Sequence, residues 1–262
     1  MRKLLLFSGG FDSTLLLADL VSNANEKEDT ITAFSFYYGI TGESKLRREW
    51  ESQLLILREL KRLYPKVNLK HEIIEIKFDY GRKYLQNVKG LTQPIFWITN
   101  IIPFLENGDK VYLGYIREDQ AILQENNIYD LFNAANRIQE NKDINLNFPL
   151  KYYDKCDVIK NLIINYPSLL EYCISCENAG YAGLNVVCGE CTPCMHLKQA
   201  LVKLSATHYD SKISDKANQL LKDLFKIKVS ITTIDETKEE EDEKDCQVET
   251  IPCDTIDEVK ES

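Results

Sequence analysis

A short apolar run near the start of the chain leads directly into a loop with paired glycines, and this junction most constrains the fold. The run covers residues 3–7, the loop reads Ser8-Gly9-Gly10-Phe11-Asp12-Ser13, and residues 14–20 have a helical composition. A buried strand that turns tightly into a helix is the first unit of an α/β fold. Asp12 and Ser13 are residue types that favour the start of such a helix.

Strand-forming and helix-forming segments alternate along the rest of the chain. We expect strands over 30–38, 69–76, 110–116 and 144–150, and helices over 43–64, 94–105, 129–139, 155–165 and 216–226. This alternation predicts an α/β, Rossmann-like parallel sheet with helices on both faces, followed by C-terminal helices. In such a sheet a ligand binds beyond the carboxyl ends of the strands.

The glycine loop has the composition of an anion-binding turn. Gly9 and Gly10 let the backbone approach an anion closely, and N–H groups at the helix start would donate to it. The hydroxyls of Ser8 and Ser13 add donors, and Asp12 can brace the loop or help to hold Mg2+. The loop lacks the lysine of a Walker loop and the third glycine of a dinucleotide-binding fingerprint. A plain turn between strand and helix is the alternative interpretation.

Five of the eight cysteines lie in one short stretch. The stretch reads Cys173-x2-Cys176, then Cys188-x2-Cys191-x2-Cys194. A spacing of two residues lets neighbouring thiolates surround one ion, and four thiolates suit a structural, tetrahedral Zn2+ site. Cys173 and Cys176 are alternatives for the first ligand, and His196 is a spare one. An iron–sulfur site is the other interpretation.

Charge is distributed unevenly along the chain. The net charge is −9, and residues 235–262 alone hold 13 acidic and 3 basic residues, so the rest is close to neutral. We expect one domain over 1–234, with a zinc-binding segment at 173–196, and an acidic disordered tail over 235–262. The near-neutral domain argues against a nucleic-acid partner. Apolar runs are too short for a membrane span or a signal peptide, so we expect a cytoplasmic protein.

The loop resembles the signature of the PP-loop ATP pyrophosphatases, and further motifs resemble one branch of them, the 7-cyano-7-deazaguanine synthases. The matching motifs are Phe36-Tyr37-Tyr38-Gly39, Gly114 with Asp119, Pro149-Leu150 with Asp154-Lys155, and Ser175-Cys176 with Cys188-Gly189-Glu190-Cys191 and Cys194. The match at Ser175-Cys176 favours Cys176 as the first zinc ligand. The resemblance implies an adenine nucleotide alpha hydrolase-like fold and a homodimer.

The resemblance implies an ATP-dependent carbon–nitrogen ligase that forms AMP and pyrophosphate, with ATP, Mg2+ and Zn2+ as cofactors. In the family, 7-carboxy-7-deazaguanine is adenylated, ammonia displaces AMP to give the amide, and a second activation gives the nitrile of queuosine biosynthesis. The residues that would hold the pyrophosphate are Ser8, Gly9, Gly10, Phe11, Asp12 and Ser13. Lys155 would be a cation near the phosphates, and Asp119 would contact Mg2+ or substrate. A surface lysine and a helix cap are the alternatives for these two residues.

Three segments depart from the family pattern. They are Ile40-Thr41-Gly42 in place of Gln-Arg-His, Pro94-Ile95-Phe96-Trp97 in place of Pro-x-Arg-Asn, and Leu123-Gln124-Glu125-Asn126-Asn127 in place of Tyr-Pro-Asp-x-Arg. The changes remove polar groups that would bind the base, whereas the ATP loop is intact.

This pattern resembles diverged relatives from bacterial anti-phage gene clusters, where the same activation would join a deazaguanine to an amine of a protein partner. Two other functions remain as alternatives. One is a catalytically inactive scaffold that binds a partner through its acidic tail. The other is a transfer-RNA thiolation enzyme, which would need a catalytic cysteine pair and a basic face that the sequence does not show.

Overall fold

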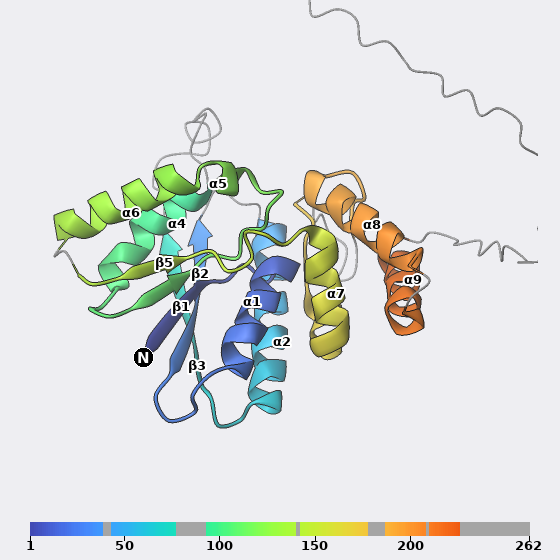
Figure 1. The fold of residues 1–262 in the computed structure, drawn as a ribbon, viewed down its shortest axis with the longest axis horizontal. Coiled ribbons are helices and arrows are strands. Elements are labelled where there is room, and N and C mark those ends of the chain that lie inside the picture. The colour runs from blue at the N-terminus through green and yellow to red at the C-terminus, as the bar shows by residue number, and fades with distance from the viewer. Residues whose placement is uncertain (39–42, 77–92, 140–141, 178–186, 208–209, 226–262) are drawn as a thin grey trace, which may run out of the picture. The chain divides into compact units, whose positions relative to one another are not determined.

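The computed structural model describes residues 1–38, 43–76, 93–139, 142–177, 187–207 and 210–225. Among these residues, five parallel strands form one sheet in the order β3-β2-β1-β4-β5 (Figure 1). The strands are β1 (Arg2–Leu6), β2 (Thr30–Tyr38), β3 (Asn68–Ile76), β4 (Lys110–Tyr112) and β5 (Asn145–Asn147). The predicted parallel α/β sheet is therefore confirmed. The strand order reverses between β1 and β4, which makes this position the topological switch point.

Helices cover both faces of the sheet (Figure 1). One face carries α1 (Phe11–Ser22) and α2 (Glu43–Leu63), and this layer continues into α7 (Lys155–Asn165), the 3-10 helix η2 (Pro167–Tyr172), α8 (Thr192–Ser205) and α9 (Ser211–Phe225). The other face carries α4 (Gln93–Ile101), the 3-10 helix η1 (Ile102–Phe104), α5 (Gln120–Leu123) and α6 (Glu125–Gln139). Within the described ranges, no helix combines the length and apolar character that a membrane crossing needs.

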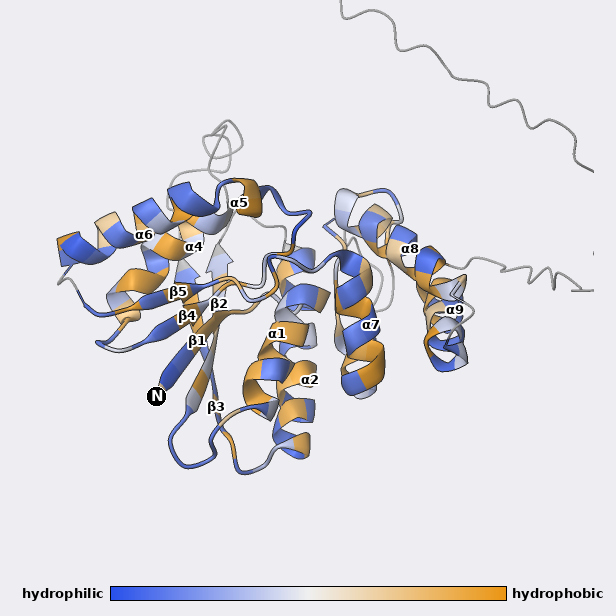
Figure 2. Cartoon of the chain, in the orientation of Figure 1, coloured by the Kyte–Doolittle hydropathy of each residue, from blue (hydrophilic) through white to orange (hydrophobic). Residues whose placement is uncertain are grey.

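The alternation of side chains along β1 explains how both layers form. Leu4 and Leu6 belong to the apolar cluster under α4 and α6, whereas Leu5 belongs to the cluster under α1 and α2. All three are almost completely buried. A strand buried on both faces is a continuous apolar run, so the run at 3–7 indicated a central strand. The helices, in contrast, are striped with hydrophobic and hydrophilic residues (Figure 2).

Two elements, β2 and α7, have the predicted bounds, and others differ. Helix α1 begins at Phe11 with Gly10 as its N-cap, so Asp12 and Ser13 lie in its first turn instead of before it. The helix predicted over 94–105 ends at Ile101 and continues as η1, because Pro103 cannot donate an intrahelical hydrogen bond. The strands predicted over 110–116 and 144–150 keep only three residues each, and α5 was not predicted. The predicted tail lies outside the described residues.

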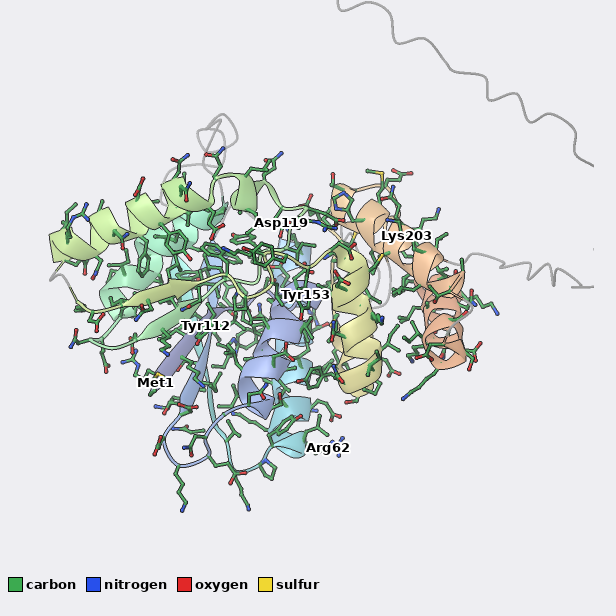
Figure 3. All side chains as sticks on the ribbon, in the orientation of Figure 1. Met1, Arg62, Tyr112, Asp119, Tyr153 and Lys203 are labelled. Atoms are coloured by element: carbon green, nitrogen blue, oxygen red, sulfur yellow. The ribbon has the colours of Figure 1, made fainter. Side chains whose placement is uncertain are left out.

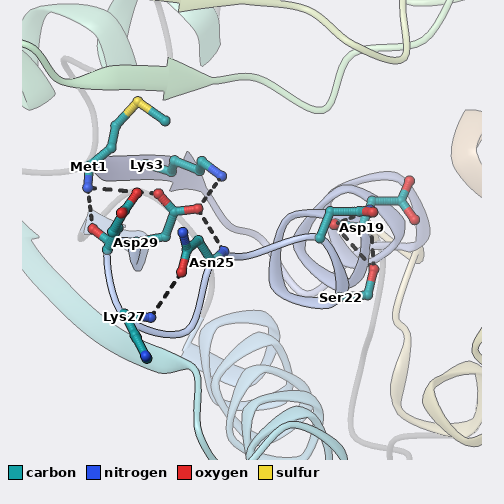
Figure 4. Close-up of polar contacts among 9 residues, drawn as sticks. Met1, Lys3, Asp19, Ser22, Asn25, Lys27 and Asp29 are labelled. Carbon is teal, nitrogen blue, oxygen red and sulfur yellow. Dashed lines mark hydrogen bonds and ion pairs between the residues drawn. The ribbon is translucent and has the colours of Figure 1, made fainter.

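Polar contacts brace the end of the sheet opposite the carboxyl ends of the strands. Asp29 accepts hydrogen bonds from Lys3 Nζ at 2.7 Å and from the Asn25 amide at 3.0 Å (Figure 4). Burial acts to raise the pKa of Asp29, but these bonds and the Lys3 charge outweigh it, and the pKa lies below its ordinary value. The ion pair therefore stabilises the ionised carboxylate between β1 and β2.

His71 on β3 is partly buried between the sheet and α2. Its Nε2 lies 2.9 Å from Ser35 Oγ, and its ring centroid lies 6.0 Å from that of Trp50. Burial, with a smaller effect from the charge of Lys61, lowers the pKa of His71 from 6.5 to about 4. The unfolded chain therefore binds a proton at a higher pH than the folded chain does.

We expect this histidine to make the folded protein sensitive to acid. Its contribution to the free energy of unfolding is complete above pH 6.5 and is lost as the pH falls toward 4. The variant His71→Gln should lose less stability over this interval, because glutamine does not titrate. Urea denaturation of both proteins at the two ends of the interval measures the difference, and equal losses would contradict the prediction.

Candidate functional site

The loop after β1 and the segment after β4 meet at the switch point and enclose a small cavity. Its volume is about 140 Å³, and it is lined by Leu6, Ser8, Gly10, Asp12, Ser13, Trp97, Gly114, Tyr115 and Asp119. A Cβ on Gly114 would lie 3.1 Å from the Ser13 Cα, so a glycine lets the two segments approach. The topology thus brings most of the predicted loop residues and Asp119 together.

The loop itself is shaped by its glycines. Gly9 has a φ of +79°, and a Cβ there would lie 2.8 Å from Ser52 Oγ on α2. The Gly10 amide donates to Ser8 Oγ at 3.3 Å, and that oxygen lies 3.1 Å from Ser13 Oγ. Phe11 is buried in the core and anchors the start of α1.

The start of α1 has free donors for an anion. No side chain caps this helix at Gly10. The first backbone N–H groups of an α-helix have no intrahelical partner, and they lie at the positive end of the helix dipole. Because Gly10 lines the cavity, these groups lie beside it. Such groups suit an anion, and the anion-binding turn stays a prediction.

Lys155 is held next to this loop. Its Nζ donates to both carboxylate oxygens of Asp12, at 2.7 and 2.6 Å, and the residue is only 9% exposed. Lys155 is the first residue of α7, which begins with a capping box between Asp154 and Asp157. The capping box fixes the first turn of α7 and thereby directs Lys155 to α1. The alternative of a surface lysine does not fit this burial.

Asp119 lies at the edge of the sheet toward which the strands run (Figure 3). It occupies the N-cap position of α5 but makes no side-chain cap bond, and its Oδ2 accepts from the Ile116 amide at 2.8 Å. Burial raises the pKa of Asp119, the charge of Asp12 raises it further, and Lys155 lowers it. A partly buried carboxyl near a second carboxylate is a site where a divalent cation would favour the ionised form.

A larger cavity adjoins the small one and shares Tyr115 and Asp119 with it. Its volume is about 1020 Å³, and its other lining residues are Pro94, Ile95, Gln120, Ala121, Leu123, Gln124, Asn127, Ile128, Leu131 and Glu177. Two of the three segments that depart from the family pattern therefore line one cavity, and the third, Ile40-Thr41-Gly42, lies outside the described residues. Sequence reasoning missed the aromatic pair Trp97 and Tyr115 in the lining of the small cavity, whose ring centroids are 6.5 Å apart.

The cysteine cluster forms a second centre. The sulfur atoms of Cys176, Cys188, Cys191 and Cys194 all lie within 4.8 Å of one another. A tetrahedral zinc site with Zn–S bonds of ~2.3 Å places its sulfurs ~3.8 Å apart. In a 4Fe–4S cluster each cysteine binds a different iron, which spreads the sulfurs further. The observed spacing therefore fits a single ion.

The backbone around the cysteines supports thiolate ligands. The Cys188 amide donates to Cys176 Sγ and the Cys191 amide to Cys188 Sγ, both at 3.3 Å. Gly189 has a φ of +78°, which permits the tight turn between these ligands. Hydrogen bonds from the Glu190 and Cys191 amides lower the pKa of the Cys188 thiol to about 6. Backbone donors thus already favour one thiolate.

Cys173 is not part of the cysteine group. Its thiol is buried in the main core and donates to the Leu169 carbonyl oxygen at 3.4 Å. Burial raises the pKa of the Cys173 thiol to about 12, which is unfavourable for a ligand. The alternative of Cys173 as first ligand is therefore wrong for this structure. His196, the spare ligand of the sequence analysis, is also outside the group.

Gly9 and Gly108 form a matched pair for testing the loop. Both have positive φ, +79° and +85°, but a Cβ would meet Ser52 Oγ at 2.8 Å in the first case and nothing within 4 Å in the second. We expect Gly9→Ala to lower the free energy of unfolding by about 1–3 kcal/mol more than Gly108→Ala, because only the first is overpacked. Urea denaturation measures both, and equal losses would show that the contact with Ser52 relaxes freely.

Comparisons with known proteins identify solved structures that are similar to this chain but no family. No family model matches the sequence, and no curated protein matches it. Among solved structures, 23 chains match. The U34-tRNA thiolase NcsA from Methanococcus maripaludis with its 4Fe-4S cluster is 15% identical, with a TM-score of 0.42, and the match covers 85% of this chain and 73% of that chain.

The NMN synthetase from Francisella tularensis is 16% identical, with a TM-score of 0.37, and the match covers 88% of each chain. At these identities and scores, the likeness carries no conclusion about the substrate or the reaction of this chain.

Proposed function

We propose that the chain binds ATP with the pyrophosphate portion in the loop 8–13 and uses it to adenylate a carboxylate. The observation that carries this proposal is the small cavity at the switch point, where the glycine loop and the start of α1 present donors. Backbone N–H groups aimed at an anion stabilise the charge that develops on a leaving pyrophosphate. The Lys155 ammonium lies beside the same loop and adds positive charge.

The charges of the site support a role for Mg2+. Asp12 and Asp119 both line the small cavity, and carboxylates repel a polyphosphate. Mg2+ binds carboxylate and phosphate oxygens together, so this donor set fits the ion. We propose that Asp119, with Asp12 nearby, holds Mg2+ on the phosphates, where the ion would neutralise their charge.

The proposed reaction has two steps. An oxygen of the substrate carboxylate attacks the α-phosphorus, and the bond to the bridging oxygen breaks, so that its electron pair leaves with pyrophosphate. An amine nitrogen then attacks the acyl carbon, loses a proton and displaces AMP. The protein supplies in-line positioning of the carboxylate and charge stabilisation of the leaving group.

The acid and the amine are finer proposals. We take 7-carboxy-7-deazaguanine as the first acid, because the stacked pair Trp97 and Tyr115 offers an aromatic platform at the cavity. Ammonia as the amine would give the primary amide. For the nitrile, the amide oxygen would attack the α-phosphorus of a second ATP with loss of pyrophosphate, and the oxygen would then leave with AMP as the nitrogen loses its protons. The adjoining cavity of about 1020 Å³ favours a larger acceptor, such as an amine on a protein partner. A homodimer, a cytoplasmic location and a structural Zn2+ ion remain predictions.

Nucleotide products test the proposed function. The full chain is incubated with ATP, Mg2+ and 7-carboxy-7-deazaguanine, with either ammonium or a candidate protein partner. We expect AMP and pyrophosphate only when the acid is present. A nitrile product would select the synthase reaction, and a mass increase on the partner would select conjugation. Release of ADP would show cleavage of the β–γ bond and contradict adenylation, whereas no turnover with any acid would favour the inactive scaffold.

A further inference from the structure

The nucleotide loop and the cysteine centre share one short segment of chain, Tyr172 to Cys176. In its middle, the Ile174 amide donates to the Gly9 carbonyl oxygen at 3.1 Å. The Ile174 carbonyl oxygen lies 3.4 Å from the position of a Cβ on Gly10. Cys176, two residues further on, is one of the four clustered cysteines. The backbone that packs behind the loop is therefore the backbone that carries a metal ligand.

Ser52 on α2 joins the loop and this segment from a third element. It is fully buried, and its Oγ lies 3.1 Å from the Gly9 carbonyl oxygen and 2.5 Å from the Tyr172 carbonyl oxygen. One hydroxyl proton is thus shared between the loop and the segment. Because both acceptors are backbone atoms, a shift of the segment changes the position of Gly9.

The two ends of the segment are held differently. The first end follows η2 and is fixed in the main core, where Cys173 is buried. The second end lies in a separate small apolar cluster whose only fully buried members, within the described residues, are Cys176 and Cys194. So little apolar surface gives this end weak support, and a metal bound by the four thiolates would be its main anchor.

We propose that the metal held by the four cysteines positions the nucleotide loop through the segment Tyr172 to Cys176, with Ser52 as a positioning residue. Metal occupancy then sets the affinity for ATP as well as the stability of the fold. The inference rests on the proposed binding of ATP. Coupling between two binding sites is commonly worth about 5–150-fold in affinity, and we expect about tenfold here.

Calorimetric titration of the full chain with Mg·ATP tests the coupling. The zinc-loaded and the chelator-stripped protein are compared below the unfolding temperature, with circular dichroism as a check on folding. We expect roughly tenfold weaker binding by the stripped protein. Equal affinities would overturn the inference alone. Absence of binding by the loaded protein would overturn the proposal of ATP binding, and this inference with it.

A second measurement keeps the test decisive if the stripped chain unfolds. In the cobalt-substituted full chain, Mg·ATP at saturation should change the thiolate–cobalt absorption, because the loop moves a ligand-bearing segment. The variant Ser52→Ala should bind Mg·ATP roughly tenfold more weakly and lose this spectral change. Ser22→Ala, which removes a hydroxyl bonded to Tyr166 at the far end of α1, should behave as wild type. An unchanged spectrum in the wild type, or a normal response in Ser52→Ala, would overturn the inference.

Discussion

Replacing Cys191 with serine is expected to lower the free energy of unfolding by about 3–5 kcal/mol, a part of the ~10–16 kcal/mol with which structural zinc stabilises small domains. At about 2–4 °C per kcal/mol for a domain of this size, the melting temperature should fall by roughly 10 °C. Binding free energy of a structural metal is folding free energy, because the unfolded chain has no preformed site. Loss of one of four ligands weakens the site and removes a part of this binding free energy.

The structure indicates why the surrounding apolar contacts cannot compensate. Cys176 and Cys194 form a small cluster of their own, apart from the two main cores. Cys176 lies in the segment after η2, Cys188 and Cys191 lie just before α8, and Cys194 lies in its first turn, so an ion would join two pieces of chain. Its loss should therefore release the start of α8 as well as the cysteines.

Thermal denaturation and elemental analysis together test this prediction. We expect one zinc ion per chain without acid-labile sulfide. Cys156→Ser is the matched control, because that partly buried thiol lies at the edge of the main core, 3.9 Å from the Ala200 carbonyl oxygen, and outside the group. It should change the free energy of unfolding by less than about 1 kcal/mol. Iron with sulfide in the purified protein, or equal stability of the two variants, would contradict the prediction.

Local patterns accounted for most of the fold. The continuous apolar run at 3–7 identified β1 as a strand buried on both faces, and the glycine pair after it located the turn. The start of α7 was predicted correctly, and the structure shows a capping box between Asp154 and Asp157 there, which is a local arrangement. The strand predicted over 110–116 was too long, because only residues up to Tyr112 pair with β1. The apolar residues after Tyr112 lie in the cavity wall or in the core.

Contacts between distant residues account for what the sequence could not predict. Lys155 was a candidate cation, but its partner Asp12 lies 143 positions away, and no local pattern links them. Ser52 lies in the middle of an amphipathic helix, where a serine carries no signal for a contact with Gly9. The sequence shows two segments, near Pro94 and Leu123, that differ from the family pattern. It does not show that they line one cavity, because this results from the packing of α4 against α6.

Lys155→Met is expected to reduce AMP formation by about 10²–10³-fold, which is the usual cost of removing one charge-stabilising group from a reacting centre. The Lys155 ammonium lies 2.6 Å from Asp12 Oδ2, next to the loop proposed to hold the leaving pyrophosphate. Without it, the Asp12 carboxylate faces the phosphates uncompensated. Lys160→Met is the control, because Lys160 lies on the same helix and is exposed.

The same change also affects folding, and the two effects have to be separated. Breaking a buried ion pair by removing one partner costs about 3–5 kcal/mol, and less here because the Asp12 side chain is 24% exposed. In the double variant Asp12→Asn with Lys155→Met, no charge remains uncompensated, so urea denaturation should show most of the stability recovered. AMP formation should stay low in the double variant, because the positive charge beside the loop is still missing. A double variant that regained both stability and turnover would show that Lys155 serves the fold alone.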